Sequence, residues 1–460
     1  MIPPDLSRLF SPRSIAVLGA SGSADKLGGQ VFARLAAGFR GELVAVNPIE
    51  REISGRPSFP SLEAMPHPVD LLLALAPGER LVEAIEACPR GRADFLLAIP
   101  SGFGEVPDRG RNLQQRLALA ARQAGIRVVG PNCVGLINAT VGLNASIIPL
   151  MPPGGAPGLG VATQSGGFGM ALAMYAADTG MAVTCFCDVG NTVDLSLADC
   201  VTHLANDPAT AVIGLYVESV RDVAEFSEAA ARAAAAKPVI VCPLARTPSG
   251  AAASLAHVGI SADEPMLAAS LPPGSLVVGS GLDLLHAARA LLWQGRKLDG
   301  RRLAIVTGTG GVGTEIADLA AEHGLVVPRF SARLTAAIAR HLPPYAASAN
   351  PVDLTPVWRD YPRLYPAIMA EIAASGEADL VAVSITDVPT TSPNLAGSLA
   401  LSAPALGMPV AVFWASRDGD IGNMAPLQAA RIPTYRSTRD VVLALSLLAR
   451  HGAPAGDNAA

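Results

Sequence analysis

The feature that most constrains the fold is an internal repeat. Residues 163–169 read Thr-Gln-Ser-Gly-Gly-Phe-Gly, and residues 307–313 read Thr-Gly-Thr-Gly-Gly-Val-Gly. Each segment follows a short apolar run and opens a predicted helix that closes at a glycine, Gly180 in the first copy and Gly324 in the second. Repeated supersecondary units bury their apolar faces by packing in series. The repeat therefore predicts two tandem α/β units.

The two copies share later landmarks and differ at one. Residues 191–196 read Asn-Thr-Val-Asp-Leu-Ser, and residues 350–355 read Asn-Pro-Val-Asp-Leu-Thr. Each copy then shows a predicted strand that ends near an acid, over 213–218 and over 380–387, followed by a proline-led strand. Only the first copy continues to a histidine, His257. A difference between two similar copies indicates where chemistry has been kept.

Composition limits the class of protein. A chain of 460 residues is long enough for about three domains. The net charge of −5, with 16% charged residues, argues against a nucleic-acid partner. Residues 128–177 and 388–416 carry no charged residue or histidine, but proline and glycine interrupt both, so neither is expected to span a membrane. The six scattered cysteines predict no disulfide framework and no signal peptide is apparent, so we expect a cytoplasmic protein.

The N-terminal part is expected to form a doubly wound parallel sheet. Residues 14–22 read as a buried strand that enters a turn of small residues, and a helix is expected from near Leu27. Ligands of such sheets bind beyond the carboxyl ends of the strands. The other predicted strands are 42–47, 69–76, 93–100 and 126–129, and a helix is predicted over 110–124.

The turn after the first strand lacks the pattern of a dinucleotide site. It has no G-x-G-x-x-G, and Asn47 stands where an NAD site would carry an acid for the ribose hydroxyls, so a dehydrogenase is disfavoured. Backbone N–H groups of the turn can still hold phosphate, with Lys26 as a nearby cation. The alternative is that the glycines only close a βα unit.

The first repeat unit combines an anion-binding turn, an acid and a histidine. Small residues at 163–167 let N–H groups face an anion at the positive end of a helix. Ser165 is not a nucleophile elbow, because Thr163 stands where that motif needs glycine. A neutral His257 can act as a nucleophile if a carboxylate accepts the N–H of its other nitrogen, and Glu218 is the candidate. The alternatives are an unliganded glycine turn and a structural histidine.

The other histidines and the cysteines are interpreted as structural. Cys185 and Cys187 alternate along a predicted strand and are expected to pack in the core, so no metal site is predicted. The remaining histidines lie in a proline loop, in or near predicted helices, or in the C-terminal tail: His67, His203, His286, His323, His341 and His451.

Taken together, these segments resemble the NDP-forming acyl-CoA synthetases. The likeness is to the CoA-binding (alpha) part of ADP-forming acetate–CoA ligase, a relative of the succinyl-CoA synthetase alpha subunit. It runs in order through the segments 9–21, 39–48, 129–135, 164–166, 189–191, 216–218 and 350–353. The resemblance implies a Rossmann-like CoA-binding domain followed by two tandem flavodoxin-like domains. The implied boundaries are 1–135, 155–295 with His257, 300–450 without that histidine, and a flexible tail at 451–460.

The resemblance also implies roles for individual residues. His257 falls at the family's phosphohistidine, and Glu218 at the acid that orients it. The implied reaction interconverts acyl-CoA, phosphate and ADP with carboxylic acid, CoA and ATP through an acyl phosphate and the phosphohistidine. The phosphate would lie on Ser165, Gly166 and Gly167. The CoA contacts would come from Gly19, Ser21, Lys26, Asn47, Pro48 and Asn132.

Two departures from the family pattern surround the histidine, and one part is missing. Residues 256–259 read Ala-His-Val-Gly where the family usually has Ser-His-Thr-Gly, and the preceding strand ends in Pro243-Leu244 rather than lysine. No segment resembles an ATP-grasp domain, so ATP or ADP with Mg²⁺ is expected on a separate beta subunit, with dimerisation of the alpha part. The co-substrate would be a small carboxylic acid. The alternative function is a non-catalytic CoA or acyl-CoA sensor or scaffold that kept the fold.

Overall fold

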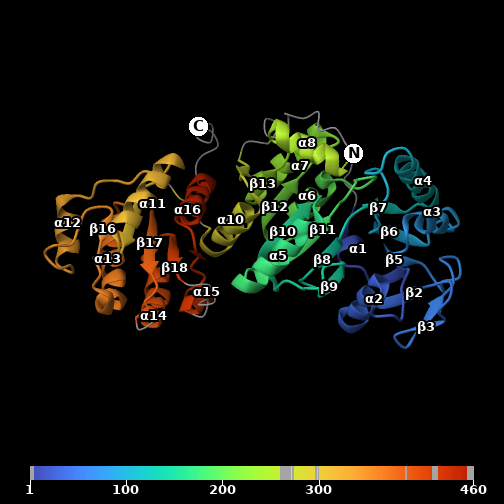
Figure 1. Cartoon of the computed structure of the whole chain (residues 1–460), viewed down its shortest axis with the longest axis horizontal. Coiled ribbons are helices and arrows are strands. Elements are labelled where there is room, and N and C mark those ends of the chain that lie inside the picture. The colour runs from blue at the N-terminus through green and yellow to red at the C-terminus, as the bar shows by residue number, and fades with distance from the viewer. Residues whose placement is uncertain are drawn as a thin grey trace. The chain divides into compact units, whose positions relative to one another are not determined.

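The computed structural model shows three β-sheets along the chain (Figure 1). It describes residues 5–258 and 271–452, apart from short gaps at 272–273, 296–297, 299, 389–390 and 417–422. The chain divides into two compact units, Met1–Gly281 and Leu282–Ala460. Unit 1 holds the first two sheets and unit 2 holds the third.

The first sheet of unit 1 is the predicted doubly wound sheet. Its strands are β1 (Ser14–Leu18), β2 (Glu42–Val46), β3 (Glu52–Ile53), β4 (Arg56–Phe59), β5 (Val69–Ala74), β6 (Ala93–Ala98) and β7 (Arg127–Val129). Its helices are α1 (Ser7–Phe10), α2 (Leu27–Gly38), α3 (Gly78–Glu86) and α4 (Arg109–Ala124). The order is β3-β4-β2-β1-β5-β6-β7, and every neighbouring pair is parallel except β3 with β4. All six residues of β5 are buried, as expected of a strand that is covered on both faces.

The second sheet of unit 1 contains the first copy of the repeat. Its strands are β8 (Gly135–Asn138), β9 (Leu143–Ser146), β10 (Gly154–Thr163), β11 (Val183–Asp188), β12 (Thr210–Val217), β13 (Val239–Pro243) and β14 (Leu276–Val277). Its helices are α5 (Gly166–Thr179), α6 (Leu197–Asn206), α7 (Val223–Ala236) and α8 (Pro248–Val258). The order is β14-β13-β12-β10-β11-β8-β9, with β8 antiparallel to both neighbours. We expected this domain to start at residue 155; β8 and β9 precede that residue and pair with its sheet.

Unit 2 contains the second copy. Its strands are β15 (Leu303–Thr307), β16 (Val352–Asp353), β17 (Leu380–Thr386), β18 (Val410–Ala415) and β19 (Thr434–Tyr435), all parallel. Its helices are α10 (Gly281–Gln294), which begins at the unit boundary, α11 (Gly310–Glu322), α12 (Ala332–Ala339), α13 (Tyr361–Ser375), α14 (Ser392–Ser402), α15 (Ala425–Ala429) and α16 (Thr438–Gly452). The order is β16-β15-β17-β18-β19.

Two features of unit 2 bear on the expected boundaries. We expected residues 281–295 in the preceding domain; in the structure, α10 makes hydrogen bonds to the end of unit 2. Arg439 donates to both carboxylate oxygens of Asp283 at 2.9 and 3.2 Å, and the Tyr435 hydroxyl donates to the His286 carbonyl at 3.0 Å. His451, assigned to the tail from the sequence, lies within α16.

The predicted tandem repeat is confirmed by strand order. Strands β10 to β14 and strands β15 to β19 follow the same order, 2-1-3-4-5, which is the flavodoxin-like arrangement. The strand register corrects the equivalence of Asp194 with Asp353 that the segments 191–196 and 350–355 predicted. Thr163 lies opposite Asp188, and Thr307 lies opposite Asp353, so the counterpart of Asp353 is Asp188 and not Asp194. Asp194 instead accepts hydrogen bonds from the Arg127 side chain and the Val128 N–H.

The cysteine pair lies in the core, as predicted. Cys185 and Cys187 are 2% and 0% exposed on β11 and belong to the main apolar cluster. His203 on α6 stacks on Phe10 with ring centroids 4.1 Å apart, a structural role. Within the described ranges, no helix has the length and apolar character needed to cross a membrane. The described residues also contain no cluster of three or more His, Cys, Asp or Glu that could hold a metal ion.

Candidate functional site

The turn between β1 and α2 requires its glycines. Gly19 has φ +89°, and a Cβ there would lie 2.8 Å from the Ala76 nitrogen. A Cβ on Gly28 would lie 2.0 Å from the Gly19 carbonyl oxygen, so the start of α2 packs directly on the turn. Lys26 is the exposed N-cap residue of α2. The predicted phosphate turn is thus a compact loop at the carboxyl end of the central strand.

The donors of this turn hold a carboxylate that the sequence analysis missed. The Ser21 hydroxyl donates to Glu50 Oε1 at 2.9 Å, and the Gly22 N–H donates to Glu50 Oε2 at 2.8 Å. Asn47 donates through Nδ2 to the Ala20 carbonyl at 2.7 Å, which ties the end of β2 to the turn. An acid three residues beyond Asn47 was visible in the sequence, and acids after the second strand of such sheets face the first turn.

Asn132 connects the two sheets of unit 1. It has φ +58° and donates through Nδ2 to Asn191 Oδ1 at 3.2 Å. The Asn191 amide donates in turn to Glu105 Oε2 at 2.6 Å and to Gln114 Oε1 at 3.0 Å. The loop after β7 is therefore bonded to the loop after β11. Strands β5 and β6 separate β7 from β1, so Asn132 and the Gly19 turn lie at different points of the same sheet edge.

The turn between β10 and α5 leaves the start of the helix open. The Thr163 hydroxyl accepts the Ser165 N–H at 2.9 Å, and Ser165 is the N-cap of α5 in extended conformation. A Cβ on Gly166 would lie 2.2 Å from Val134 Cγ1, so only glycine fits there. A Cβ on Gly167 would meet nothing within 4 Å, so the first turn of α5 has free space on that side. The arrangement suits an anion at the helix N-terminus.

Gln164 brings Glu218 to this turn. Its Oε1 accepts the N–H groups of Glu218 and Ser219, both at 3.0 Å, and its Nε2 donates to Ser219 Oγ at 3.4 Å. The structure therefore places the predicted acid and the residues Ser165, Gly166 and Gly167 at one edge of the sheet. The backbone of His257 belongs to the last turn of α8, but its side chain lies outside the described residues.

Asp188 is a second carboxyl group at this edge that the sequence analysis missed. It is 1% exposed at the end of β11. Its Oδ2 accepts the Val134 N–H at 2.8 Å, and its Oδ1 accepts the Gly190 N–H at 3.1 Å. The pKa of Asp188 is raised to about 7, chiefly by burial; the two N–H groups oppose the rise and the charge of Glu218 contributes to it. The rule that predicted Glu218, an acid at a strand end, would also have found Asp188.

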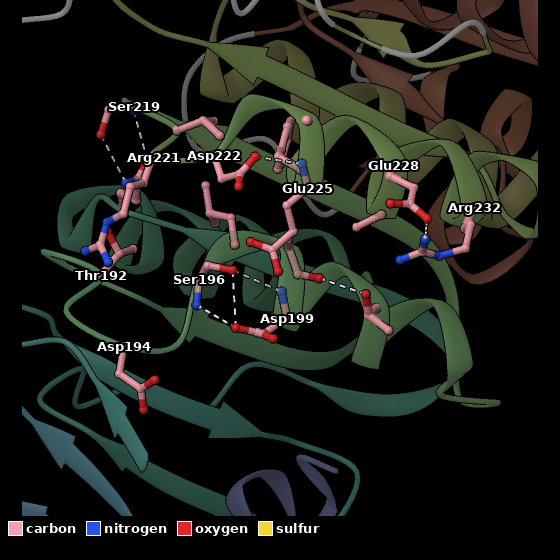
Figure 2. A pocket seen from close by; sticks show the side chains of 18 of the residues that line it. Thr192, Asp194, Ser196, Asp199, Ser219, Arg221, Asp222, Glu225, Glu228 and Arg232 are labelled. Atoms are coloured by element: carbon pink, nitrogen blue, oxygen red, sulfur yellow. Dashed lines mark hydrogen bonds and ion pairs between the residues drawn. The ribbon is translucent and has the colours of Figure 1, made fainter. Parts of the chain in front are cut away.

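A cavity of about 750 Å³ opens beside the turn, between α6 and α7 (Figure 2). Gln164 and Ser219 line the end of the cavity next to the β10–α5 turn, so the cavity continues from that turn. Five acids and three arginines contribute to its lining: Asp194, Asp199, Asp222, Glu225, Glu228, Arg127, Arg221 and Arg232. Figure 2 shows two of the acids bonded in helix caps, Asp199 with Ser196 and Asp222 with the Glu225 N–H. One end of the cavity reaches the loops after β10, β11 and β12, beyond the strand ends where such sheets bind ligands.

The second copy keeps the turn and has an acid, Asp353, at the register position of Asp188 in the first copy. The Thr307 hydroxyl accepts the Thr309 N–H at 3.0 Å, as Thr163 does for Ser165. A Cβ on Gly310 would lie 3.0 Å from Asp353 Oδ2, so a carboxylate of the protein lies beside the start of α11.

Known families match in the order expected. A CoA binding domain matches residues 13–139, a succinyl-CoA ligase like flavodoxin domain matches 156–291, and a ligase-CoA domain matches 303–370. The acetate–CoA ligase (ADP-forming) II subunit alpha of Pyrococcus furiosus is 32% identical over 351 residues, which cover 76% of each chain. The chain belongs to the family of the ADP-forming acetate–CoA ligase alpha subunits.

Two further relatives support this assignment. The acetate–CoA ligase (ADP-forming) I of Archaeoglobus fulgidus is also 32% identical, and the match covers 76% of this chain but 50% of that one. The structure of the dinucleotide-forming acetyl-coenzyme A synthetase 1 of Ca. Korarchaeum cryptofilum, in complex with phosphate and ADP, superposes with a TM-score of 0.87 at 29% identity and covers 97% of both chains. Members of this family thus share all three domains of the chain.

Proposed function

We propose that the chain is the alpha part of an ADP-forming acyl-CoA ligase. The reaction interconverts acyl-CoA, phosphate and ADP with a carboxylic acid, CoA and ATP. One observation carries the proposal: Gln164 holds Glu218 beside a turn whose helix start is open at Gly167. An acid next to an anion-binding helix start is what a phosphohistidine site requires, because the acid orients the imidazole and the N–H groups hold the phosphoryl oxygens.

CoA would bind at the carboxyl edge of the first sheet. Gly19, Ser21 and Lys26 form or flank its first turn, and this turn already holds a carboxylate on the Ser21 hydroxyl and the Gly22 N–H. The donor set therefore fits an anionic group such as a phosphate of CoA. Asn47, Pro48 and Asn132 would shape the neighbouring loops of the same edge. Bound CoA supplies the thiol that accepts the acyl group.

His257 would carry the phosphoryl group. A neutral imidazole nitrogen attacks the phosphorus of the acyl phosphate, the N–P bond forms, and the acyl O–P bond breaks to release the carboxylate. The Glu218 carboxylate would accept the N–H of the other ring nitrogen and stabilise its positive charge. The N–H groups of Ser165, Gly166 and Gly167 would hold the phosphoryl oxygens at the start of α5. Transfer to ADP then restores the neutral imidazole.

The nucleotide would bind on another subunit. The P. furiosus relative is itself a subunit alpha, and the A. fulgidus relative is about twice the length of the match. We infer a separate ATP-grasp beta subunit that holds ADP or ATP with Mg²⁺, and dimerisation of the alpha part. The acid would be a small carboxylic acid, and the cavity between α6 and α7, which reaches Gln164, is a candidate entry.

The test is acyl-CoA synthesis from ATP, CoA and a panel of carboxylic acids. The chain alone should form no acyl-CoA, and addition of an ATP-grasp subunit from the same organism should start turnover, which His257→Asn abolishes. Calorimetry should show CoA binding by the wild-type chain and by His257→Asn. CoA binding without turnover on any acid would favour the sensor function instead. Turnover by the chain alone, in a sample free of a second protein by mass spectrometry, would contradict the two-subunit proposal.

A further inference from the structure

The first turn of unit 1 is occupied by an anion of the chain itself. The Glu50 carboxylate accepts from the Ser21 hydroxyl and from the Gly22 N–H, at 2.9 and 2.8 Å. The contact is close, because a Cβ on Gly22 would lie 2.8 Å from Glu50 Oε2. Hydroxyl and backbone N–H donors that converge on a carboxylate would serve a phosphate oxygen equally well. Two anions cannot use the same donors at once.

Three other N–H donors of the turn are used within the protein. The Ser23 N–H donates to Ser21 Oγ at 3.2 Å, and the Lys26 N–H donates to the Ser23 carbonyl at 3.2 Å. The Gly19 N–H donates to the Val46 carbonyl at 3.0 Å. The Ser21 hydroxyl and the Gly22 N–H, by contrast, already converge on an anionic group.

The loop that carries Glu50 is held at its base. Asn47 Oδ1 accepts the N–H groups of Ile49 and Glu50 at 2.8 and 3.0 Å, and Asn47 Nδ2 lies 3.4 Å from Glu50 Oε1. Ile49 is 84% exposed, so the loop lies at the surface. With its backbone fixed in this way, the Glu50 carboxylate can leave the turn by rotation of its side chain alone.

We propose that Glu50 competes with CoA for the β1–α2 turn and thereby sets the affinity of the chain for CoA. The proposal rests on CoA binding at this turn. A phosphate that displaces the carboxylate still experiences its charge, because the fixed backbone keeps Glu50 nearby. Two unit charges about 4 Å apart repel by about 1 kcal/mol even at the dielectric constant of water. Removal of the Glu50 charge should therefore strengthen CoA binding at least about fivefold.

The test is calorimetric titration of the full-length chain with CoA and with pantetheine, which has no phosphate. Glu50→Gln keeps the side-chain length and an oxygen for the Ser21 hydroxyl, Glu50→Ala removes the competitor altogether, and circular dichroism checks that each variant folds. Glu52→Gln is the matched control, because Glu52 is an exposed acid on β3 two residues away. We expect CoA to bind both Glu50 variants at least about fivefold more tightly than the wild type and Glu52→Gln, with no gain for pantetheine.

The outcomes separate this proposal from the ligase proposal. If the wild type binds CoA and the Glu50 variants bind it equally well or more weakly, the competition is overturned and the ligase proposal stands. An equal gain for pantetheine would also overturn it, because the gain would not come from phosphate. CoA binding by the Glu50 variants but not by the wild type would support both proposals. No CoA binding by any variant would defeat both.

Discussion

Raising the pH from 5 to 8 should destabilise unit 1 through one carboxyl group, Asp188. Its pKa is about 7 in the folded chain, against an ordinary value of 3.8 for an aspartate in water. Between these two values the folded state holds a proton that the unfolded state has lost, so stability falls as the pH rises through this window. The effect is absent below both pKa values and complete above about pH 7. The cause is burial, because the side chain is 1% exposed with only two N–H groups to stabilise its charge.

The magnitude follows from the two pKa values. The full penalty is about 4 kcal/mol, and about 2–3 kcal/mol of it should develop between pH 5 and pH 8. Asp188→Asn removes the titration. The amide keeps one acceptor oxygen for the Val134 or Gly190 N–H, so the variant should lose about 1–3 kcal/mol at pH 5, where the wild-type group is neutral. At pH 8 the variant should be as stable as the wild type or more stable.

Urea unfolding at several pH values measures this difference. The transition of unit 1 should be fitted separately, because a chain with several domains does not unfold in one step. Infrared difference spectra give an independent check, since a protonated carboxyl band should disappear between pH 6 and 8 in the wild type and be missing from Asp188→Asn. Parallel pH profiles of the two proteins, with no such band, would refute the argument that burial keeps Asp188 protonated.

Two further predictions concern Glu218 and the β10–α5 turn beside it. Glu218→Gln keeps the size of the side chain but removes the charge that orients the imidazole. Phosphoryl transfer, measured with the partner subunit, should slow by about 10²–10⁴-fold, and CoA binding measured by calorimetry should be retained. Transfer at the wild-type rate would show that Glu218 has only a structural role. Gly166→Ala places a methyl group 2.2 Å from the stiff Val134 side chain and should lower the free energy of unfolding in urea by about 1–3 kcal/mol. The methyl group of Gly167→Ala meets nothing within 4 Å and should not lower it. Equal losses in the two variants would contradict the close packing at Gly166.

The architecture was largely predictable because its strands are buried on both faces. Continuous apolar runs such as β5 indicate covered parallel strands, and the duplicated Thr163 and Thr307 turns predicted that two sheets would share one strand order. The exception is the pair β8 and β9, which lie in a stretch without charged residues: β8 pairs antiparallel with β11, and β9 pairs antiparallel with β8. Strands this short carry no periodic signal that assigns them to one sheet or the other.

The site was predictable where local sequence determines geometry. Gly19, Gly166 and Gly167 lie in strand-to-helix turns, and Glu218 follows a strand that neighbours β10. Glu50 and Asp188 were visible in the sequence as acids at or near strand ends, but their contacts were not, because the partners lie far away in the chain: the donors to Glu50 come from the β1–α2 turn, and one donor to Asp188 comes from the loop after β7. Register also decides that Asp188, not Asp194, matches Asp353, and a single sequence does not reveal register.

Phosphorylation of His257 is the most direct test of the account. The chain should be incubated with its ATP-grasp subunit, Mg²⁺ and ATP labelled on the γ-phosphate, then separated and treated with acid or alkali. The account predicts a label on the wild-type chain that survives alkali and is lost in acid, as a phosphohistidine requires, and no label on His257→Asn. An equal label on His257→Asn, or a label that withstands acid, would contradict a phosphohistidine carrier at this position.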